Sequence, residues 1–445
     1  MIDKTRPNVV VILVDDLGWG DLSCYGAPDL RTPCIDKIAA SGMKFENFYA
    51  NSSVCSPSRA SLLTGRYPGL VGVPGVIRTY DWQNYGYFDP AAVTLGDMFR
   101  SGGYSTALIG KWHLGLESPN TPNERGFDYF RGFLGDMMDD YYTHLRHGNN
   151  YMRRDSRPVD PDGHATDLFT EWGVQYLREK SKSNHPFFLY LAYNAPHTPI
   201  QPPEEWHQRV RERHPDASGK RSRLIALIEH LDHGIGRIMD TLRETGLADS
   251  TMVVFTSDNG GDLPAGARIG PWRGSKTHMY DGGLRVPMAA AWPGVISEGS
   301  VTDARALIMD IFPTVMAACD LDIQHEVDGS SFLSILKGET DSLQPRDEYF
   351  LFLQNGMRDA VRIGNDKLVN DDPDENGYEL FDLKADPFEQ HDLSSVDPVR
   401  YNTLYESMQS HLERVWATRW RNSSQLKKGD TVMKKDGRPN PRLSR

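Results

Sequence analysis

The segment Asn8-Val9-Val10-Val11-Ile12-Leu13-Val14-Asp15-Asp16 indicates the fold class of this chain. An apolar run rich in β-branched residues is followed at once by two aspartates. Short runs of this composition that end in polar residues are typical of buried strands. We therefore predict a strand over residues 8–14 whose end presents the Asp15 and Asp16 carboxylates.

Three further apolar segments also end in polar, reactive residues. They are Ser105–Ile109 before Gly110-Lys111-Trp112-His113, Phe187–Tyr193 before Asn194-Ala195-Pro196-His197, and Met252–Thr256 before Ser257-Asp258-Asn259-Gly260-Gly261. Apolar residues recur at helical spacing from Leu224 to Leu242, and Gly246 is a suitable stop. This alternation predicts an α/β fold with a large, mostly parallel sheet sandwiched by helices. Ligands bind at the carboxyl ends of such strands, so the four polar clusters predict one active site.

The sequence pattern changes near residue 336. Short strands with tight turns are expected at Glu348–Leu353, Asp359–Ile363, Lys367–Val369 and Glu379–Asp382, followed by a helix from about Pro398 to Trp416. We expect a catalytic α/β domain over 1–335 and a smaller C-terminal subdomain, an antiparallel sheet plus helix, over 336–426. Residues 427–445 form a basic tail, interpreted as a solvated surface segment, with anion attraction as the alternative.

Composition excludes several classes of function. The chain has 445 residues, 39% of them hydrophobic, and a formal net charge of −12, which argues against a nucleic-acid binder. A local cationic pocket for an anionic substrate is still compatible with this charge. No apolar run approaches the roughly 20 residues of a membrane-spanning helix, so no membrane partner is expected. The four cysteines are irregularly spaced and predict no disulfide framework.

The first eight residues are polar and lead directly into the first strand. We interpret this as the absence of a signal peptide, and expect a cytoplasmic protein as the chain stands. A periplasmic or secreted protein is expected if a signal has been removed.

Two pairs of residues at strand ends are candidates for a metal site. Asp15-Asp16 and Asp258-Asn259 offer only oxygen ligands, which Ca²⁺ and Mg²⁺ prefer. Adjacent carboxylates repel one another unless a cation or strong donors compensate. The structural alternative is that these residues are helix caps or turn formers.

Cys55 lies at the start of Cys55-Ser56-Pro57-Ser58-Arg59, where Pro57 suggests the first turn of a helix. A helix N-terminus favours an anion, and residue 55 would face it. The alternative is an inert, buried thiol.

Four further residues complete the candidate site. Lys111 and Lys276 are cations that could hold an oxyanion, and His113 and His197 could move protons near neutral pH. Taken singly, each is also compatible with a surface lysine or a structural histidine. His144 and His147 could line a substrate pocket, although a structural role is the simpler interpretation.

With these motifs in place, the chain resembles the formylglycine-dependent sulfatases of the alkaline phosphatase superfamily. Cys55-Ser56-Pro57-Ser58-Arg59 matches the C-x-P-S-R signature, and Gly110-Lys111-Trp112-His113-Leu114-Gly115 matches a second one. The resemblance runs in order from residue 8 to about 393. It also includes Asn8–Gly20, Ala195-Pro196-His197, Ser257–Gly261, Gly274–Pro287 and Tyr378–Pro387.

The resemblance implies a sulfuric ester hydrolase with a nucleophile made from Cys55. A formylglycine-generating enzyme would convert Cys55 to formylglycine, whose hydrated form supplies two hydroxyls. One hydroxyl attacks sulfur and also contacts the metal. Asp15, Asp16, Asp258 and Asn259 would hold one cation, preferably Ca²⁺, with Mg²⁺ as the alternative.

The resemblance also assigns roles to the remaining residues. Lys111 and Lys276 would hold the sulfate oxygens, and Arg59 would steady the hydroxyl at residue 55. His197 would donate a proton to the leaving oxygen. His113 would accept a proton from the second hydroxyl, so that sulfate is eliminated.

Several alternatives remain open from the sequence. One is a phosphonate monoester or phosphodiester hydrolase that uses the same nucleophile. Others are an arylsulfatase of broad specificity and an inactive, sulfatase-like binding protein. We favour a carbohydrate sulfate over a small aryl sulfate because Thr121–Asp128 and Asp140–His144 resemble segments of sugar-active sulfatases. Three aromatic residues could stack on a sugar or belong to the core: Tyr80, Trp82 and Trp272.

Overall fold

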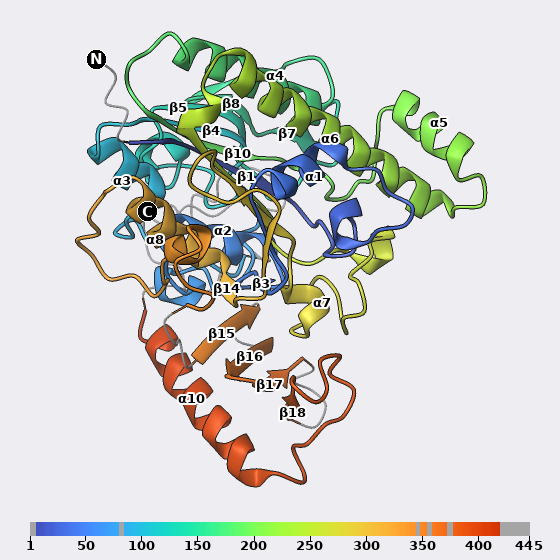
Figure 1. The fold of residues 1–445 in the computed structure, drawn as a ribbon, viewed down its shortest axis with the longest axis vertical. Helices are drawn as coiled ribbons and strands as arrows, with labels where there is room; N and C mark the ends of the chain where they lie inside the picture. The colour runs from blue at the N-terminus through green and yellow to red at the C-terminus, as the bar shows by residue number, and fades with distance from the viewer. Residues whose placement is uncertain (1–5, 80–83, 344–347, 354–357, 372–376, 419–445) are drawn as a thin grey trace.

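The computed structural model describes residues 6–79, 84–343, 348–353, 358–371 and 377–418. Its larger part is a mixed ten-stranded sheet flanked by helices, and its smaller part is a four-stranded antiparallel sheet with one long helix (Figure 1). This arrangement confirms the predicted fold class. The proposed division after residue 335 stays a prediction.

The large sheet is built around strand β1 (Asn8–Val14), which is the predicted strand over residues 8–14. β1 pairs in parallel with β10 on one side and with β11 on the other. All seven of its residues are buried, because neighbouring strands and helices cover both faces. The order across the sheet is β13 (Ser300–Thr302), β2 (Met43–Phe45), β12 (Met288–Ala291), β11 (Thr251–Ser257), β1, β10 (Phe187–Ala192), β4 (Ser105–Lys111), β5 (Tyr129–Phe133), β8 (Met152–Arg154) and β9 (Arg157–Pro158).

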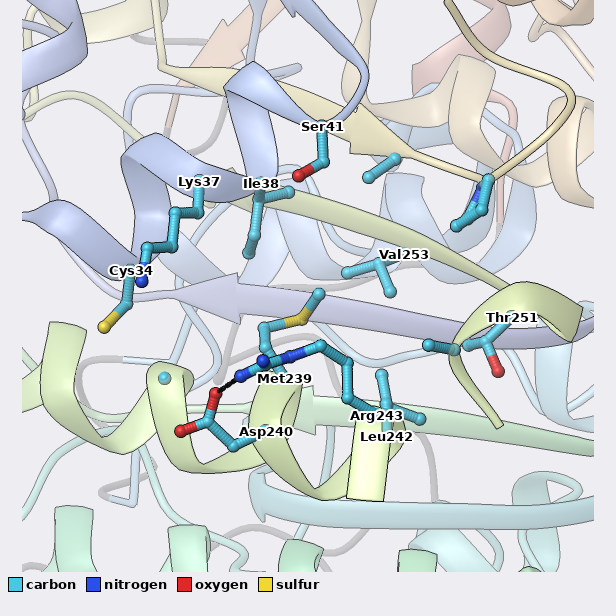
Figure 2. A pocket seen from close by; sticks show the side chains of 14 residues that line it. Cys34, Lys37, Ile38, Ser41, Met239, Asp240, Leu242, Arg243, Thr251 and Val253 are labelled. Atoms are coloured by element: carbon cyan, nitrogen blue, oxygen red, sulfur yellow. Dashed lines mark hydrogen bonds and ion pairs between the residues drawn. The ribbon is translucent and has the colours of Figure 1, made fainter. Parts of the chain in front are cut away.

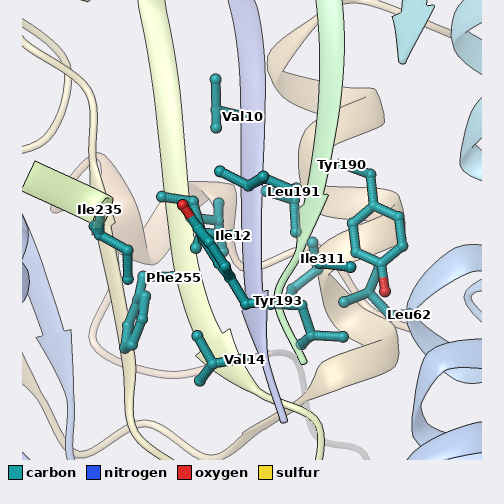
Figure 3. Close-up of a cluster of buried hydrophobic side chains, with 14 of the residues drawn as sticks. Val10, Ile12, Val14, Leu62, Tyr190, Leu191, Tyr193, Ile235, Phe255 and Ile311 are labelled. Carbon is teal, nitrogen blue, oxygen red and sulfur yellow. The ribbon is translucent and has the colours of Figure 1, made fainter. Parts of the chain in front are cut away.

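Helices on both faces bury the apolar side chains of the central strands. α1 (Pro33–Ala40), α4 (Ala165–Lys180) and α6 (Gly219–Glu244) pack together on one face, while α2 (Cys55–Thr64), α3 (Leu95–Ser101) and α8 (Ile311–Ala318) pack on the other. Figure 3 shows Ile235 of α6 on one side of β1 in that view, and Leu62 of α2 and Ile311 of α8 on the other. The central strands are thereby held rigidly, and rigid strands position the residues at their ends.

The smaller sheet comprises β15 (Glu348–Leu353), β16 (Arg358–Ile363), β17 (Asp366–Asn370) and β18 (Glu379–Asp382). Helix α10 (Pro398–Trp416) packs on β16 and β17. The strands and the helix lie close to the predicted ranges. Val361 and Leu368 of this sheet share a buried cluster with Met279 and Leu284 of the larger part, so the two parts share an apolar contact.

Several short elements complete the described structure. They are β3 (Phe48–Tyr49) with β14 (Ala306–Leu307), β6 (Leu145–Arg146) with β7 (Asn149–Asn150), α5 (Glu204–Arg213), α7 (Asp281–Leu284) and α9 (Leu333–Leu336). Within the described ranges, none of the helices is long and apolar enough to cross a membrane.

Candidate active site

The four polar clusters predicted at strand ends meet at one edge of the large sheet. The Asp15 backbone N–H donates to the Ala195 carbonyl at 3.1 Å, and the Asp258 N–H donates to the Val14 carbonyl at 3.1 Å. Lys111 is the last residue of β4 rather than part of the following loop, and its side chain points to the same place. The parallel register of β1 with its neighbours therefore brings residues that are far apart in sequence into one buried cluster.

Each acid of the cluster contacts a cation. Lys111 Nζ lies 2.5 Å from Asp15 Oδ2, and Lys276 Nζ lies 2.6 Å from Asp16 Oδ2. The buried guanidinium of Arg59 donates from Nε and Nη2 to Asp258 Oδ2 at 3.0 and 2.8 Å. Such charge-assisted bonds compensate for the removal of these charges from water.

The electrostatics differ between two of the acids. Burial raises the pKa of Asp15, but the nearby Lys111 and His197 outweigh it and hold that pKa well below its usual value. Burial and the charge of Asp15 raise the pKa of Asp258 to about 7, despite Arg59. The carboxylates of the cluster thus repel one another despite their cationic partners, and a further cation would relieve this repulsion.

The oxygen ligands of this cluster fit a hard divalent cation. One potential ligand atom from each of Asp15, Asp16, Cys55 and His197 lies within 4.8 Å of the others. Asn259 Nδ2 donates to Asp16 Oδ1 at 2.8 Å, while the buried Asn259 Oδ1 has no hydrogen-bond partner among the described residues. A buried amide oxygen without a partner is costly, and coordination of a cation would satisfy it.

Cys55 is the first residue of α2 and faces this cluster. Its thiol donates to Asp15 Oδ1 at 3.3 Å. Burial and the charge of Asp15 raise the pKa of the Cys55 thiol well above its usual value. A cysteine nucleophile requires a thiolate, so these surroundings do not suit Cys55 as an unmodified nucleophile.

The two site histidines have different hydrogen bonds. His113 Nε2 lies 2.7 Å from the Ile77 carbonyl, which assigns the proton to Nε2, and Nδ1 has no partner among the described residues. Burial, with Lys111 and Arg59 nearby, holds the pKa of His113 well below its usual value. His113 is therefore neutral and has a free lone pair on Nδ1, as a proton acceptor requires.

His197 has the opposite ring nitrogen tied to the backbone. Its Nδ1 lies 2.6 Å from the Thr198 carbonyl, and its Nε2 lies 3.6 Å from Asp16 Oδ2. Burial and the Lys276 charge lower its pKa. Nε2 is therefore the atom that can exchange a proton inside the cluster.

Sequence reasoning missed residues that support the site without belonging to its motifs. Ser56 Oγ accepts a hydrogen bond from the Ile77 N–H at 3.1 Å, which fixes the loop that holds His113. Tyr190, on β10, is buried beside Arg59, and burial raises its pKa. The signature around residue 55 contained Ser56, but nothing in the sequence paired it with Ile77.

The predicted substrate-pocket residues have mixed outcomes. His144 is buried, with Nε2 2.9 Å from the Gly163 carbonyl, so it has a structural contact. Trp272 packs edge-on against Trp19 and beneath the Arg285 guanidinium. Two of the aromatic residues considered, Tyr80 and Trp82, lie outside the described residues.

A separate cavity of about 400 Å³ lies between α1 and α6 (Figure 2). It is lined by apolar residues such as Met239 and Val253, with an Arg243–Asp240 ion pair at its side. Thr251, at its edge, begins β11, whereas Asp258 follows the other end of that strand. This cavity is therefore at the opposite end of the sheet from the candidate active site.

Comparisons with known proteins agree with this arrangement. The N-acetylgalactosamine-6-sulfatase of Sus scrofa is 33% identical over 357 residues, which make up 75% of this chain and 66% of that protein. This chain therefore spans slightly less than two thirds of that relative's length.

Solved structures share the fold over almost the whole chain. The crystal structure of Ps i-CgsB in complex with k-i-k-neocarrahexaose has a TM-score of 0.85 and 27% identity, covering 94% of this chain and 95% of that one. The PsFucS1 sulfatase from Pseudoalteromonas sp. has a TM-score of 0.77 and 25% identity, covering 92% and 91%.

Two family models also match. The model described as N-sulphoglucosamine sulphohydrolase, C-terminal, matches residues 272–418, and the model described as Sulfatase matches residues 7–321. Since the second of these spans the large sheet and every residue of the candidate site, the chain belongs to the sulfatase family.

Proposed function

We propose that this protein hydrolyses sulfate esters of carbohydrates, with a formylglycine made from Cys55 as its nucleophile. The observation that carries the proposal is the position of Cys55. It begins a helix, donates to Asp15 within the acidic cluster suited to a cation, and has Lys111 and Lys276 nearby. Its raised thiol pKa supports conversion to another group, because a protonated thiol is a poor nucleophile.

The metal ligands, the two lysines and Arg59 have separate roles in sulfate transfer. A divalent cation held by Asp15, Asp16, Asp258 and Asn259 would lower the pKa of a hydroxyl beside it and polarise a sulfate oxygen. Lys111 and Lys276 hold the sulfate oxygens and stabilise the charge that develops on them. Arg59 donates to Asp258 and keeps that carboxylate in place.

The two histidines supply and remove protons. His197 Nδ1–H is committed to the Thr198 carbonyl, so His197 acts as an acid only when Nε2 carries a second proton, which the Asp16 carboxylate 3.6 Å away favours. His197 donates this Nε2 proton to the sugar oxygen that leaves. His113 accepts a proton at Nδ1 from the hydroxyl at residue 55, and this allows sulfate to leave and the aldehyde to re-form. The neutral state of His113 suits it for this step.

A carbohydrate substrate is supported by the similar proteins. The names of these relatives refer to an N-acetylgalactosamine-6-sulfatase and to a complex with a neocarrahexaose. A sulfated sugar also fits a site that must protonate a poorly acidic alcohol, which His197 can do. We therefore place sulfated mono- or oligosaccharides ahead of aryl sulfates as substrates.

The first test is sulfate release from a panel of sulfated sugars, a nitrophenyl sulfate and a phosphodiester. Peptide mass spectrometry first measures formylglycine at residue 55, and Cys55→Ala is the blank. Release from a sulfated sugar that falls by at least about 10⁴-fold in Cys55→Ala is expected, since the nucleophile is gone.

Other outcomes would redirect the proposal. Active enzyme with only an unmodified thiol would overturn the formylglycine mechanism. Faster turnover of the phosphodiester than of every sulfate would favour a phosphodiester hydrolase with the same site. Activity that survives exhaustive chelation of divalent cations would exclude the metal role.

A further inference from the structure

The loop that carries His197 rests on the side chain of Tyr141. The Tyr141 hydroxyl lies 2.9 Å from the Asn194 carbonyl and 2.9 Å from the His197 carbonyl. Its single proton is shared between the two carbonyl oxygens that bracket the loop. Tyr141 is 1% exposed, so water does not compete for these contacts.

A second connection joins the same two segments on the other side of His197. Gln201 Oε1 accepts from the Tyr141 backbone N–H at 2.8 Å, and Gln201 Nε2 donates to Asp140 Oδ2 at 2.8 Å. The chain is thus tied to the Tyr141 segment both before and after His197. Two-sided attachment restricts rotation of the histidine loop as well as its displacement.

The ring of Tyr141 is itself held by a neighbouring histidine. His164 stacks on it with ring centroids 4.9 Å apart and an interplanar angle of 25°. Both nitrogens of His164 are engaged, since Nε2 lies 3.0 Å from the Gln201 carbonyl and Nδ1 accepts from the Thr166 N–H at 3.2 Å. His164 therefore acts as a fixed platform, and neither of its nitrogens is free to bind a ligand.

We propose that Tyr141 is a positioning residue that holds His197 Nε2 in reach of the leaving oxygen of the sulfate ester. The inference rests on the proposed role of His197 as the proton donor. A general acid acts only within hydrogen-bond distance of the atom it protonates, and a displacement of about 1 Å can cost roughly a hundredfold in rate. Through Tyr141, the Asp140–His144 segment thereby serves the chemistry by way of His197.

The variant Tyr141→Phe keeps the ring and its stacking but removes the hydroxyl. Loss of proton donation matters most for a poor leaving group, such as a sugar alcohol, and little for nitrophenolate. We expect kcat/KM on a sulfated sugar to fall roughly ten- to a hundredfold, with a change of less than about threefold on nitrophenyl sulfate. A fall of equal size on both substrates would overturn the inference.

Tyr25→Phe is the matched control. The Tyr25 hydroxyl is also buried and lies 2.7 and 2.9 Å from the Phe45 and Met288 carbonyls; it also accepts from the Met288 N–H at 3.0 Å, and it contacts none of the candidate site residues. It should lose at least as much thermal stability as Tyr141→Phe but show no difference between the two substrates. A substrate-selective loss in Tyr25→Phe would mean that the effect reflects general destabilisation, which would also overturn the inference.

The pair Tyr141 and His197 is then tested in a double variant. If Tyr141 acts through His197, adding Tyr141→Phe to His197→Ala should cause less than about a twofold further loss on the sulfated sugar. A full additional loss would contradict the inference while leaving the role of His197 intact. If His197→Ala alone has the same effect on both substrates, the proposed proton donor is wrong, and the inference falls with it.

Discussion

Two buried groups of charged residues lie in this protein, and they use their charges differently. The candidate-site cluster contains Asp15, Asp16, Asp258, Arg59, Lys111 and Lys276, and the joint cluster, between the two sheets, contains Asp281, Arg285, Lys367 and Glu389. Both combine acids and bases in equal number. The two clusters differ in whether every buried polar atom beside them has a hydrogen-bond partner within the protein.

In the joint cluster the protein supplies the partners itself. Lys367 Nζ lies 2.8 Å from Asp281 Oδ1 and 2.6 Å from Glu389 Oε1. Glu389 Oε2 accepts from the Asp281 backbone N–H at 2.8 Å, and Arg285 donates to Asp281 Oδ2 at 3.0 Å. Each of the four carboxylate oxygens therefore has a partner.

The carboxylate oxygens of the candidate-site cluster also have partners, but two polar atoms beside that cluster do not. Asn259 Oδ1 and His113 Nδ1 are buried without a hydrogen-bond partner among the described residues. In a natural protein, such atoms require an explanation, and a ligand or a proton transfer provides one. The two clusters therefore differ in the atoms beside them: the joint cluster is satisfied by the protein, whereas Asn259 Oδ1 and His113 Nδ1 are left for a ligand or a proton.

The largest expected effect comes from opening the joint cluster. Lys367→Met leaves Asp281 and Glu389 buried without their shared cation, and should lower the free energy of unfolding by about 3–5 kcal/mol. Urea unfolding measures this, with Lys384→Met as an exposed control. The folded fraction should keep its kcat within a few fold. A loss of less than about 1 kcal/mol would show that the joint cluster does not stabilise the fold.

The next effect comes from the candidate-site cluster, where removal of a polar group should affect binding more than stability. Asn259→Ala should raise the calcium concentration for half-maximal activity by roughly ten- to a hundredfold. The free energy of unfolding without metal should change by less than about 1 kcal/mol, because a buried oxygen without a partner is removed along with the hydrogen bonds of Asn259 Nδ2. An unchanged calcium requirement would remove Asn259 from the metal site, and the exposed Asn184→Ala is the control.

The residues of the candidate-site cluster could be predicted to lie together from the sequence, whereas those of the joint cluster could not. Asp15, Lys111 and Asp258 each follow or end an apolar run, and a parallel sheet brings such strand ends to one edge. By contrast, Lys367 meets Asp281 across 86 residues with no strand pairing between them. Neither hydrophobic periodicity nor motif spacing in the sequence predicts such a contact.

The same limit applies to residues that support the site, but not to the bounds of helix α10. Tyr141 reaches the His197 carbonyl across 56 residues, and its sequence neighbourhood suggested sugar contact instead. Helix α10, Pro398–Trp416, matched its predicted range because Pro398 and the apolar spacing are local signals. Local patterns therefore predicted the elements and the site, whereas the contacts that brace them depend on tertiary packing.

The smallest expected effect concerns Asp359, a buried acid that has neither a closed set of partners nor a catalytic role. It lies in β16, is 1% exposed, and its Oδ1 has no hydrogen-bond partner among the described residues. Burial raises its pKa to about 7, even though a hydrogen bond with Tyr378 lowers it. Asp359 thus tends to keep its proton near neutral pH in the folded protein. The proton neutralises the buried carboxyl group, as lysine and arginine side chains do in the other two clusters.

This predicts the sign of a pH effect. The pKa of Asp359 is higher in the folded protein than in the unfolded chain. Between these two values the folded state holds a proton that the unfolded state has lost, so the free energy of unfolding falls as the pH rises toward about 7. Asp359→Asn should gain on the order of 1–2 kcal/mol in free energy of unfolding relative to the unaltered protein between pH 5.5 and pH 8. Urea unfolding at both pH values measures the difference, with the exposed Asp341→Asn as control. If the gain is absent, Asp359 is ionised at both pH values, so a partner must stabilise its charge as Lys367 does in the joint cluster.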